Sequence, residues 1–268
     1  MKLDILMSCM HQTDDRLIAT SQITGNAVVI NQCDREEEQW YSTANGRVRF
    51  LSTTQRGLTK SRNMAIAHSD ADVCLLCDDD EIFVPGYQEK ILDAYANLPQ
   101  ADVVIFKMVD RDCPFGEAPK QLKFPQTMHV ASWQISFRRE RLLESGVRFD
   151  ELLGAGTGNG AEEELKFLLD CQKAGLSIWY APVEIAQVAQ TESTWFAGFN
   201  EKFFYDRGAT TRYILGAPLA VAYALYYVVK KTKMYQSQIS SGQAMTAIFR
   251  GIWENPITKQ ARKKGLLR

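Results

Sequence analysis

Hydrophobic and polar positions form two repeating patterns in the first half of this chain. Short runs of β-prone apolar residues predict buried strands, and segments with apolar residues three and four apart predict helices between them. The strands are expected at residues 3–10, 27–30, 48–51, 73–77 and 102–108, and the helices at residues 14–23, 59–67 and 85–98. This alternation predicts parallel βαβ units, whose crossover connections are nearly always right-handed.

The pattern is less regular after residue 110. A proline-containing loop at residues 110–127 is followed by an expected strand at 130–137, which suits an antiparallel position in a mixed sheet. Four glycines within residues 154–160 predict a mobile loop or a close backbone approach to a ligand. A helix at 161–174, closed by Gly175, and a strand at 177–180 complete the pattern.

The composition is that of a globular protein with a sizeable core, since 46% of the 268 residues are hydrophobic and 24% are charged. Six cysteines are scattered along the chain, and no secretory signal pattern precedes the first strand. Free thiols in a reducing cytoplasm are therefore expected. The charge is uneven, with 12 Lys and Arg against 3 Asp and Glu in residues 196–268, and 19 against 29 in the remainder. An acidic body with a basic tail indicates a tail directed toward a surface.

Residues 213–229 contain no charged side chain and are followed by Lys230, Lys231 and Lys233. A membrane-spanning helix needs about 20 apolar residues, so this stretch of 17 is short for a span. Its four tyrosines and the lysines after it suit a helix that lies at a membrane interface. We therefore expect contact with a membrane surface through residues 213–233 and 259–268. The alternatives are a helix packed against the catalytic body or a second copy, and a true span.

The strand expected at residues 73–77 ends in four consecutive acids, Asp78, Asp79, Asp80 and Glu81. Their carboxylates would repel one another unless a cation lies among them. Mg2+ and Mn2+ prefer oxygen ligands, often one or two carboxylates together with substrate phosphates. In open α/β sheets, ligands bind outside the carboxyl ends of the strands. The acids thus predict a metal–nucleotide site, with a solvated acidic turn as the alternative.

Four segments resemble motifs of the family 2 glycosyltransferases. They are Asn31-Gln32-Cys33-Asp34, Arg56-Gly57-Leu58-Thr59-Lys60-Ser61-Arg62-Asn63, Asp78-Asp79-Asp80 and Glu162-Glu163-Glu164-Leu165-Lys166-Phe167. The resemblance covers about residues 3–195 and implies an α/β fold of the GT-A type, a Rossmann-like mixed sheet flanked by helices. Residues 1–195 would form this nucleotide-sugar-binding and catalytic domain. Residues 196–268 would be a basic and aromatic helical extension that associates with a membrane or forms oligomers.

The resemblance also implies roles in binding a nucleotide-sugar donor. Asp34 would contact the nucleoside, while Lys60 and Arg62 would approach the base or the diphosphate. His11, in the loop after the first strand, is a further candidate for lining the nucleotide pocket. Solvated helix or turn positions are the alternative for these residues. The full set of expected donor-binding residues is His11, Asp34, Lys60, Arg62, Asp78 and Asp79.

The metal and the general base are implied in the same way. The divalent cation, Mg2+ or Mn2+, would be held by Asp78 and Asp80 and would neutralise charge on the departing nucleoside diphosphate. Glu163 or Glu164 would be the base that deprotonates the acceptor hydroxyl, with inversion at the anomeric carbon. Acids in the first turn of a helix also stabilise its macrodipole, so capping is the alternative for residues 162–164.

The sequence departs from the family pattern at two places. The second acid of the usual Glu-Asp pair is a glutamate here, and residues 187–194 lack the histidine that many members carry. A metal held mostly by Asp80 and the diphosphate is therefore expected. The Gln-x-x-Arg-Trp motif and the long apolar spans of processive synthases are missing too, which favours transfer of one sugar per encounter. Trp133 is a candidate for stacking on a sugar, with core packing as the alternative.

The expected function is that of an inverting glycosyltransferase. It would move a sugar from a nucleotide-diphosphate donor to a saccharide or lipid-linked saccharide in cell-surface polysaccharide synthesis. A cytoplasmic location, peripheral on the inner membrane, follows from the resemblance and the basic tail. A homo-oligomer is also expected, and a nucleic-acid partner is not. The alternatives are a sugar-phosphate nucleotidyltransferase and a non-catalytic sugar-nucleotide-binding subunit.

Overall fold

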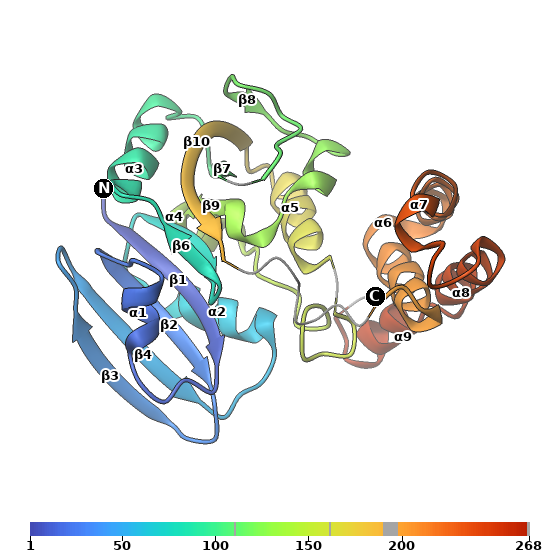
Figure 1. The fold of residues 1–268 in the computed structure, drawn as a ribbon, viewed down its shortest axis with the longest axis horizontal. Helices are drawn as coiled ribbons and strands as arrows, with labels where there is room; N and C mark the ends of the chain where they lie inside the picture. Colours follow the sequence, from blue (N-terminus) through green and yellow to red (C-terminus); the bar gives the residue numbers. More distant parts are fainter. Residues whose placement is uncertain (110, 161, 190–197, 267–268) are drawn as a thin grey trace. The chain divides into compact units, whose positions relative to one another are not determined.

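The computed structural model describes residues 1–109, 111–160, 162–189 and 198–266. The chain forms two compact units, the first from residues 1–149 and 164–191 and the second from residues 150–163 and 192–268. A sheet with flanking helices makes up the first unit, and helices make up most of the second (Figure 1).

One mixed sheet forms the centre of the first unit. Its strands are β1 (Leu3–Met10), β2 (Asn26–Gln32), β3 (Glu37–Ser42), β4 (Arg47–Thr53), β5 (Val73–Asp78), β6 (Glu81–Phe83), β7 (Val103–Met108), β8 (Lys120–Gln121), β9 (Ile135–Arg138) and β10 (Ile178–Val188). Their order is β3-β4-β2-β1-β5-β9-β7-β10-β6, with β8 paired to β10. The β4, β2, β1 and β5 strands are parallel neighbours, so their carboxyl ends meet at one edge of the sheet.

Helices cover both faces of this sheet (Figure 1). They are α1 (Arg16–Thr20), α2 (Leu58–His68), α3 (Tyr87–Asn97), α4 (Arg139–Ser145) and α5 (Glu163–Lys173). Ile5 and Met7 of β1 pack with α1 and α3 on one face, whereas Leu6 packs with α2, α4 and α5 on the other. Burial on both faces explains why these strands appear in the sequence as continuous apolar runs.

The structure confirms the βαβ alternation and the antiparallel position of β9, which pairs with β5 and with β7. The β3 strand was not expected from the sequence. Its residues alternate between exposed and half-buried at the sheet edge, and Trp40 and Tyr41 are the only apolar ones among them. An edge strand that contributes little to the core needs no apolar run, so it gives no hydrophobic signal.

The second unit contains α6 (Glu201–Lys230), α7 (Thr232–Tyr235), α8 (Ser241–Glu254) and α9 (Pro256–Lys263). The α6 helix is interrupted at Gly216, whose backbone is not helical (φ 78°, ψ 174°). The chain folds back there, because the guanidinium of Arg207 lies 2.5 Å from the hydroxyl of Tyr223 and the ring of Phe204 lies 6.1 Å from that of Tyr227. We call residues 201–215 the first limb and residues 217–230 the second limb.

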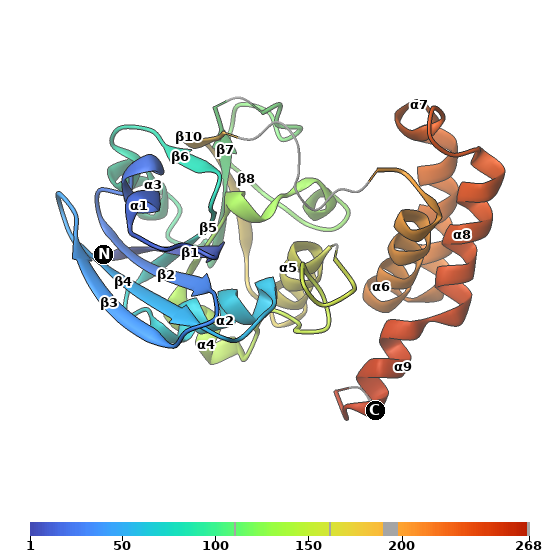
Figure 2. The same ribbon diagram turned by 60° about the horizontal axis from the view of Figure 1, so that its bottom comes forward.

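The α6 and α8 helices lie side by side (Figure 2). Their backbones touch at two glycines. A Cβ atom added at Gly208 would lie 2.0 Å from the carbonyl oxygen of Ile248, and one added at Gly251 would lie 2.0 Å from that of Tyr205. Only glycine permits so close an approach at these positions.

Within the described part of the chain, α6 is the one helix long and apolar enough to cross a membrane by length and composition. Each of its limbs has about 15 residues, whereas a span needs about 20. The turn at Gly216 therefore argues against the true span that the sequence left open as an alternative.

Candidate active site

Polar side chains gather at the carboxyl edge of the parallel strands. His11 follows β1, Asp34 follows β2, Arg56 follows β4 and Asp78 ends β5. The sheet register places these strand ends next to one another, since β1 lies between β2 and β5 and β2 lies between β1 and β4. The edge is thus the place in the first unit where the motifs of the sequence converge.

Asp78 is held by side chains from two other elements. Its Oδ1 atom lies 3.0 Å from Nη2 of Arg62 on α2, and its Oδ2 atom accepts a hydrogen bond of 3.2 Å from the hydroxyl of Ser132. Arg62 is only 2% exposed, and its guanidinium lies 5.4 Å from the ring centroid of Phe149. An ion pair in such a buried position fixes the orientation of both groups.

A tight turn after Asp78 carries Asp79 and Asp80, and Glu81 then begins β6. Glu81 is 1% exposed, and its Oε1 atom accepts a hydrogen bond of 2.6 Å from the backbone N–H of Asp78. The N–H of Ala189, just past β10, donates to the carbonyl oxygen of Asp80 at 2.7 Å. These contacts fix the shape of the acidic turn.

The acids of this turn resist ionisation. Burial is the largest cause, and the charge of Asp78 adds to it, so the pKa values of Asp79, Asp80 and Glu81 are all raised, that of Glu81 well above its usual range. A divalent cation would relieve this repulsion. Arg111 partly opposes the rise in the pKa of Asp80.

Among the described residues, no group of three or more His, Cys, Asp or Glu side chains is arranged to hold a metal ion. The turn does fit a cation that takes one or two carboxylates from the protein and its other ligands from phosphate and water, as Mg2+ commonly does. Burial and neighbouring carboxylates raise the pKa values of Asp79 and Asp80, and a cation bound to one or two of these carboxylates would oppose that rise.

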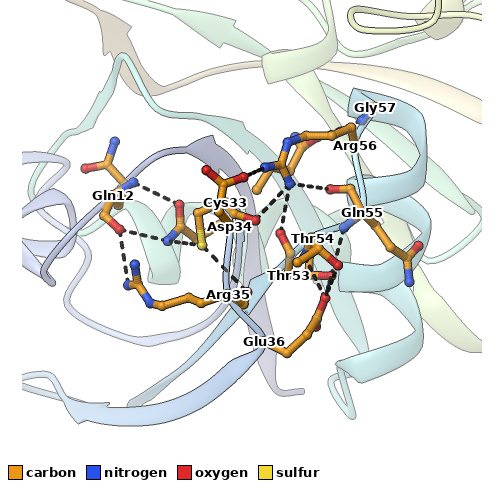
Figure 3. A network of polar contacts seen from close by, with 12 residues as sticks. Gln12, Cys33, Asp34, Arg35, Glu36, Thr53, Thr54, Gln55, Arg56 and Gly57 are labelled. Atoms are coloured by element: carbon orange, nitrogen blue, oxygen red, sulfur yellow. Dashed lines mark hydrogen bonds and ion pairs between the residues drawn. The ribbon is translucent and has the colours of Figure 1, made fainter.

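The loop after β2 is cross-linked to the loop after β4 (Figure 3). Asp34 Oδ1 lies 2.5 Å from Nη2 of Arg56, and Nη1 of Arg56 donates to the carbonyl oxygens of Cys33 and Thr53 at 2.9 and 3.2 Å. The Asp34 side chain is nevertheless 90% exposed. A carboxylate that is both fixed and open to solvent is well placed to meet a ligand.

The other expected donor residues lie at the same edge or close to it. His11 is exposed, with a left-handed backbone (φ 53°), and its N–H donates to the carbonyl oxygen of Gln32 at 3.1 Å. Lys60 is exposed on the first turn of α2, two residues before the buried Arg62. Both therefore present charged or polar groups to solvent, which agrees equally with ligand binding and with simple solvation.

Trp133 lies in a short 3-10 helix (Ser132–Gln134) before β9. It is partly buried against the core, and the guanidinium of Arg111 lies 5.9 Å from its ring centroid. The core-packing alternative thus accounts for part of its surface. Ser132, Arg111 and Glu81 were missed as site residues, because only the folded chain brings the first two to the acidic turn.

The two expected bases stand at the start of α5. Glu163 is buried and Glu164 is half-buried, and the division between the two units runs between them. Glu162 precedes them with a left-handed backbone (φ 66°) and pairs with Arg207 at 2.8 Å within the second unit. Residues 190–194 of the stretch that lacks a histidine are outside the described residues.

Residues 28–152 match the family model described as Glycosyl transferase family 2. Among curated proteins, none matches the chain. The solved structure of S. aureus TarS 1–349 shares 15% sequence identity with this chain at a TM-score of 0.58, covering 99% of this chain and 92% of that one. The complex of the same protein with UDP-GlcNAc gives 17% identity and a TM-score of 0.59 over the same shares. At this identity the likeness shows the fold, and it confirms the GT-A fold. The family match covers residues 28–152, a little under half of the chain.

Proposed function

We propose that the protein is an inverting glycosyltransferase that uses a nucleotide-sugar donor. The observation that carries this proposal is the acidic turn at the end of β5, in which Asp78 is fixed by Arg62 and Ser132. It lies within the segment that matches the family model. The complexes of TarS 1–349 with UDP-GlcNAc and with UDP support a nucleotide sugar as the donor.

The transfer would proceed in one displacement. The acceptor oxygen forms a bond to the anomeric carbon while the bond from that carbon to the diphosphate oxygen breaks, and the diphosphate leaves with the electron pair. Glu163 or Glu164 takes the proton of the acceptor hydroxyl, a contribution of about 10²–10⁴-fold to the rate. Attack from the face opposite the leaving group inverts the anomeric configuration.

The diphosphate would bind at the acidic turn. A divalent cation, Mg2+ or Mn2+, held by Asp80 with Asp78, would neutralise the charge of the leaving group when bound. Arg62 orients Asp78, and Asp79 lies in the same turn. Asp34, His11 and Lys60 would contact the nucleoside and phosphates from the neighbouring strand ends. We propose a saccharide or lipid-linked saccharide as the acceptor, in cell-surface polysaccharide synthesis, on the strength of the family resemblance.

We also propose that the second limb of α6 contacts an anionic membrane surface. One side of this limb packs on α8 and the first limb through Ala220, Ala224, Tyr227 and Val228. The other side is exposed and carries no charge before Lys230. We call this exposed side the apolar stripe; it consists of Pro218, Leu219, Ala222, Leu225, Tyr226 and Val229.

Basic residues follow the apolar stripe directly at Lys230, Lys231 and Lys233. Helices with an apolar side and adjoining lysines bind at the interface of anionic membranes, and each basic residue near the surface contributes about 1 kcal/mol. The exposed basic side chains of α9 and the residues after it would add to the attraction. These features support a location on the cytoplasmic face of a membrane.

The transferase is tested by supplying nucleotide sugars with Mn2+ and following the release of free nucleoside diphosphate. The wild type is expected to release it, and the matching donor should raise the unfolding free energy by about 2.7 kcal/mol at 100 times its Kd. Asp80→Asn should lose this donor stabilisation. Of Glu163→Gln and Glu164→Gln, one should keep donor binding while kcat falls about 10²–10⁴-fold.

Asp93→Asn is the matched control, because Asp93 is an exposed acid on α3 and is not one of the proposed site residues. It should leave donor binding and kcat unchanged. Exchange of pyrophosphate into the donor would instead identify a nucleotidyltransferase. Donor binding without any turnover would identify a non-catalytic subunit. Either result would refute the proposed transfer.

A further inference from the structure

The first limb of α6 holds both ends of the glycine-rich segment at residues 150–162. At one end, the hydroxyl of Tyr213 donates to Oδ2 of Asp150 at 2.5 Å. At the other end, Nη1 of Arg207 lies 2.8 Å from Oε1 of Glu162. All four residues belong to the second unit, and two positions of a single helix limb therefore fix the start and the end of the segment.

The side chains of Arg207 and Glu162 are both largely buried. The side chain of Arg207 is 16% exposed and that of Glu162 is 15% exposed. The guanidinium also donates to the hydroxyl of Tyr223 at 2.5 Å and lies 4.6 Å from the ring centroid of Tyr227 and 4.9 Å from that of Phe203. A charged pair is costly to bury, and apolar side chains of similar volume often stabilise a fold as well. The burial of this pair thus suggests a purpose other than stability.

The position of Glu162 suggests that purpose. Its backbone is in the left-handed region (φ 66°), which residues other than Gly, Asn and Asp rarely adopt. Such a conformation persists only where the surroundings enforce it, and such residues cluster at functional sites. Glu162 directly precedes Glu163, the first residue of α5, so its conformation sets the direction in which that helix begins.

Three glycines of the segment between Asp150 and Glu162 have backbone conformations that other residues rarely adopt. Gly154, Gly156 and Gly158 all have left-handed backbones, with φ of 93°, 85° and 85°. Glycine loses more conformational freedom on ordering than any other residue. Hydrogen bonds within the segment join Gly154 to Asn159 and Asn159 to Leu152, and the first limb of α6 holds Asp150 and Glu162 at its two ends.

We propose that Arg207 is a positioning residue for catalysis: by holding Glu162 it fixes the start of α5, and with it the carboxylate of Glu163 or Glu164 that accepts the proton of the acceptor. Arg207 itself touches neither donor nor acceptor. The inference rests on the proposed transferase function. It assigns the C-terminal helices a role in the chemical step in addition to the proposed membrane contact.

The test compares Arg207→Met, Arg207→Lys and Glu162→Gln in the full chain. Arg207→Met should lower kcat by about 10- to 100-fold, because a misplaced catalytic group costs this much. Its donor KM and its stabilisation by donor should stay within about twofold of the wild type, since the proposed donor residues lie in the first unit. Arg207→Lys should recover part of kcat, because an ammonium group can still pair with Glu162. Glu162→Gln should fall between the two.

The pH profile separates positioning from a loss of folded protein. The wild-type kcat should rise with pH, because only an ionised carboxylate accepts a proton. Arg207→Met should lose this rise, whereas a loss of folded protein would scale kcat equally at every pH. Asp206→Asn is the control, because it breaks an exposed pair with Lys202 on the same limb that does not reach the segment.

Two results would overturn the inference alone: a folded Arg207→Met with wild-type kcat, or an unchanged pH profile in all three variants. If Arg207→Met fails to fold, Glu162→Gln and Tyr213→Phe decide, because each loosens one end of the segment and leaves Arg207 in place. Wild-type protein that binds donor but releases no nucleoside diphosphate would refute the transferase function, and with it the premise of the inference.

Discussion

Asp78 receives Arg62 from α2 and Ser132 from the segment before β9, so its carboxylate is fixed before any ligand arrives. Groups that are oriented in advance need no reorganisation when charge develops in a reaction. The same arrangement makes the site vulnerable. Removing Asp78 would cost the buried Arg62 its ion pair with this carboxylate, and a hydrogen bond to a charged group typically contributes about 1.5–3 kcal/mol.

The acidic turn predicts a pH-dependent effect of metal. The pKa values of Asp79, Asp80 and Glu81 are raised in the folded protein, so their contribution to stability is complete at acid pH and is lost as pH rises through the raised values. Near neutral pH the ionised turn is destabilising without a counter-ion, and Mn2+ should relieve it. Thermal unfolding should show a larger increase in Tm with Mn2+ at about pH 7.5 than at about pH 5, where protons compete.

Equal ionic strength supplied as KCl is the control for general screening, and Asp80→Asn should abolish most of the Mn2+ effect. A stabilisation by Mn2+ that is the same at both pH values would contradict the assignment of the cation to this turn. A stabilisation by Mn2+ that persists in full in Asp80→Asn would contradict this assignment as well.

At the scale of residues, the sequence was sufficient to locate the site residues that follow directly after a predicted strand. Asp78 and Asp80 stand at the end of an apolar run, and this pattern alone placed them at the carboxyl end of a strand. Ser132 and Arg111 lie more than 30 residues from the turn, and nothing local marks them. Glu81 was seen as one more acid, because its burial depends on the pairing of β6 with β10.

At the scale of elements, the turn at Gly216 changes the meaning of the uncharged stretch at 213–229. The stretch belongs to two limbs that pack on each other, so it cannot act as one continuous helix. Gly216 and Pro218 are residue types that commonly interrupt a helix. The direction of the chain after the break depends on Arg207, Tyr223 and the aromatic core, and pairings over such separations leave no local pattern.

The contact of α6 with α8 yields a prediction about stability. Gly208→Ala and Gly251→Ala should each lower the unfolding free energy by about 1–3 kcal/mol, because the new methyl would lie 2.0 Å from a backbone oxygen of the other helix. Chemical denaturation measures this. Gly242→Ala is the matched control on α8, because nothing lies within 4 Å of its added Cβ, and alanine favours a helix over glycine by up to about 1 kcal/mol. Equal effects at Gly208 and Gly242 would refute the close approach.

At the scale of the whole molecule, the excess of positive charge and the exposed apolar stripe lie in the same part of the chain. Residues 196–268 carry the excess of basic residues, and the apolar stripe of α6 lies within them. The sequence predicted this separation of an acidic body from a basic tail from composition alone. It could not show which side of the helix is exposed, because that depends on how the limbs and α8 pack.

The membrane contact is tested by cosedimentation with lipid vesicles. The full chain should bind vesicles that contain anionic lipid more strongly than neutral ones, and added salt should weaken the binding. Leu225→Glu, which places a charge in the apolar stripe, should abolish it. Leu143→Glu is the matched control, because Leu143 is an equally exposed leucine on α4 of the first unit.

Binding that is equal for neutral and anionic vesicles, or that survives Leu225→Glu, would refute the lipid assignment. A dimer that forms in solution and is lost in Leu225→Glu would show instead that a second copy covers the apolar stripe.

The hydrogen bond from Ala189 to Asp80 determines where this protein can be recombined with another. The connection to the C-terminal helices departs from the sheet at a residue already anchored to the acidic turn. A chimera that exchanges those helices should therefore be joined downstream of Ala189. A junction upstream of Ala189 would replace the residues of β10 that pair with β6, and this would distort the acidic turn. Loss of activity in such a chimera would then report on the turn and not on the exchanged helices.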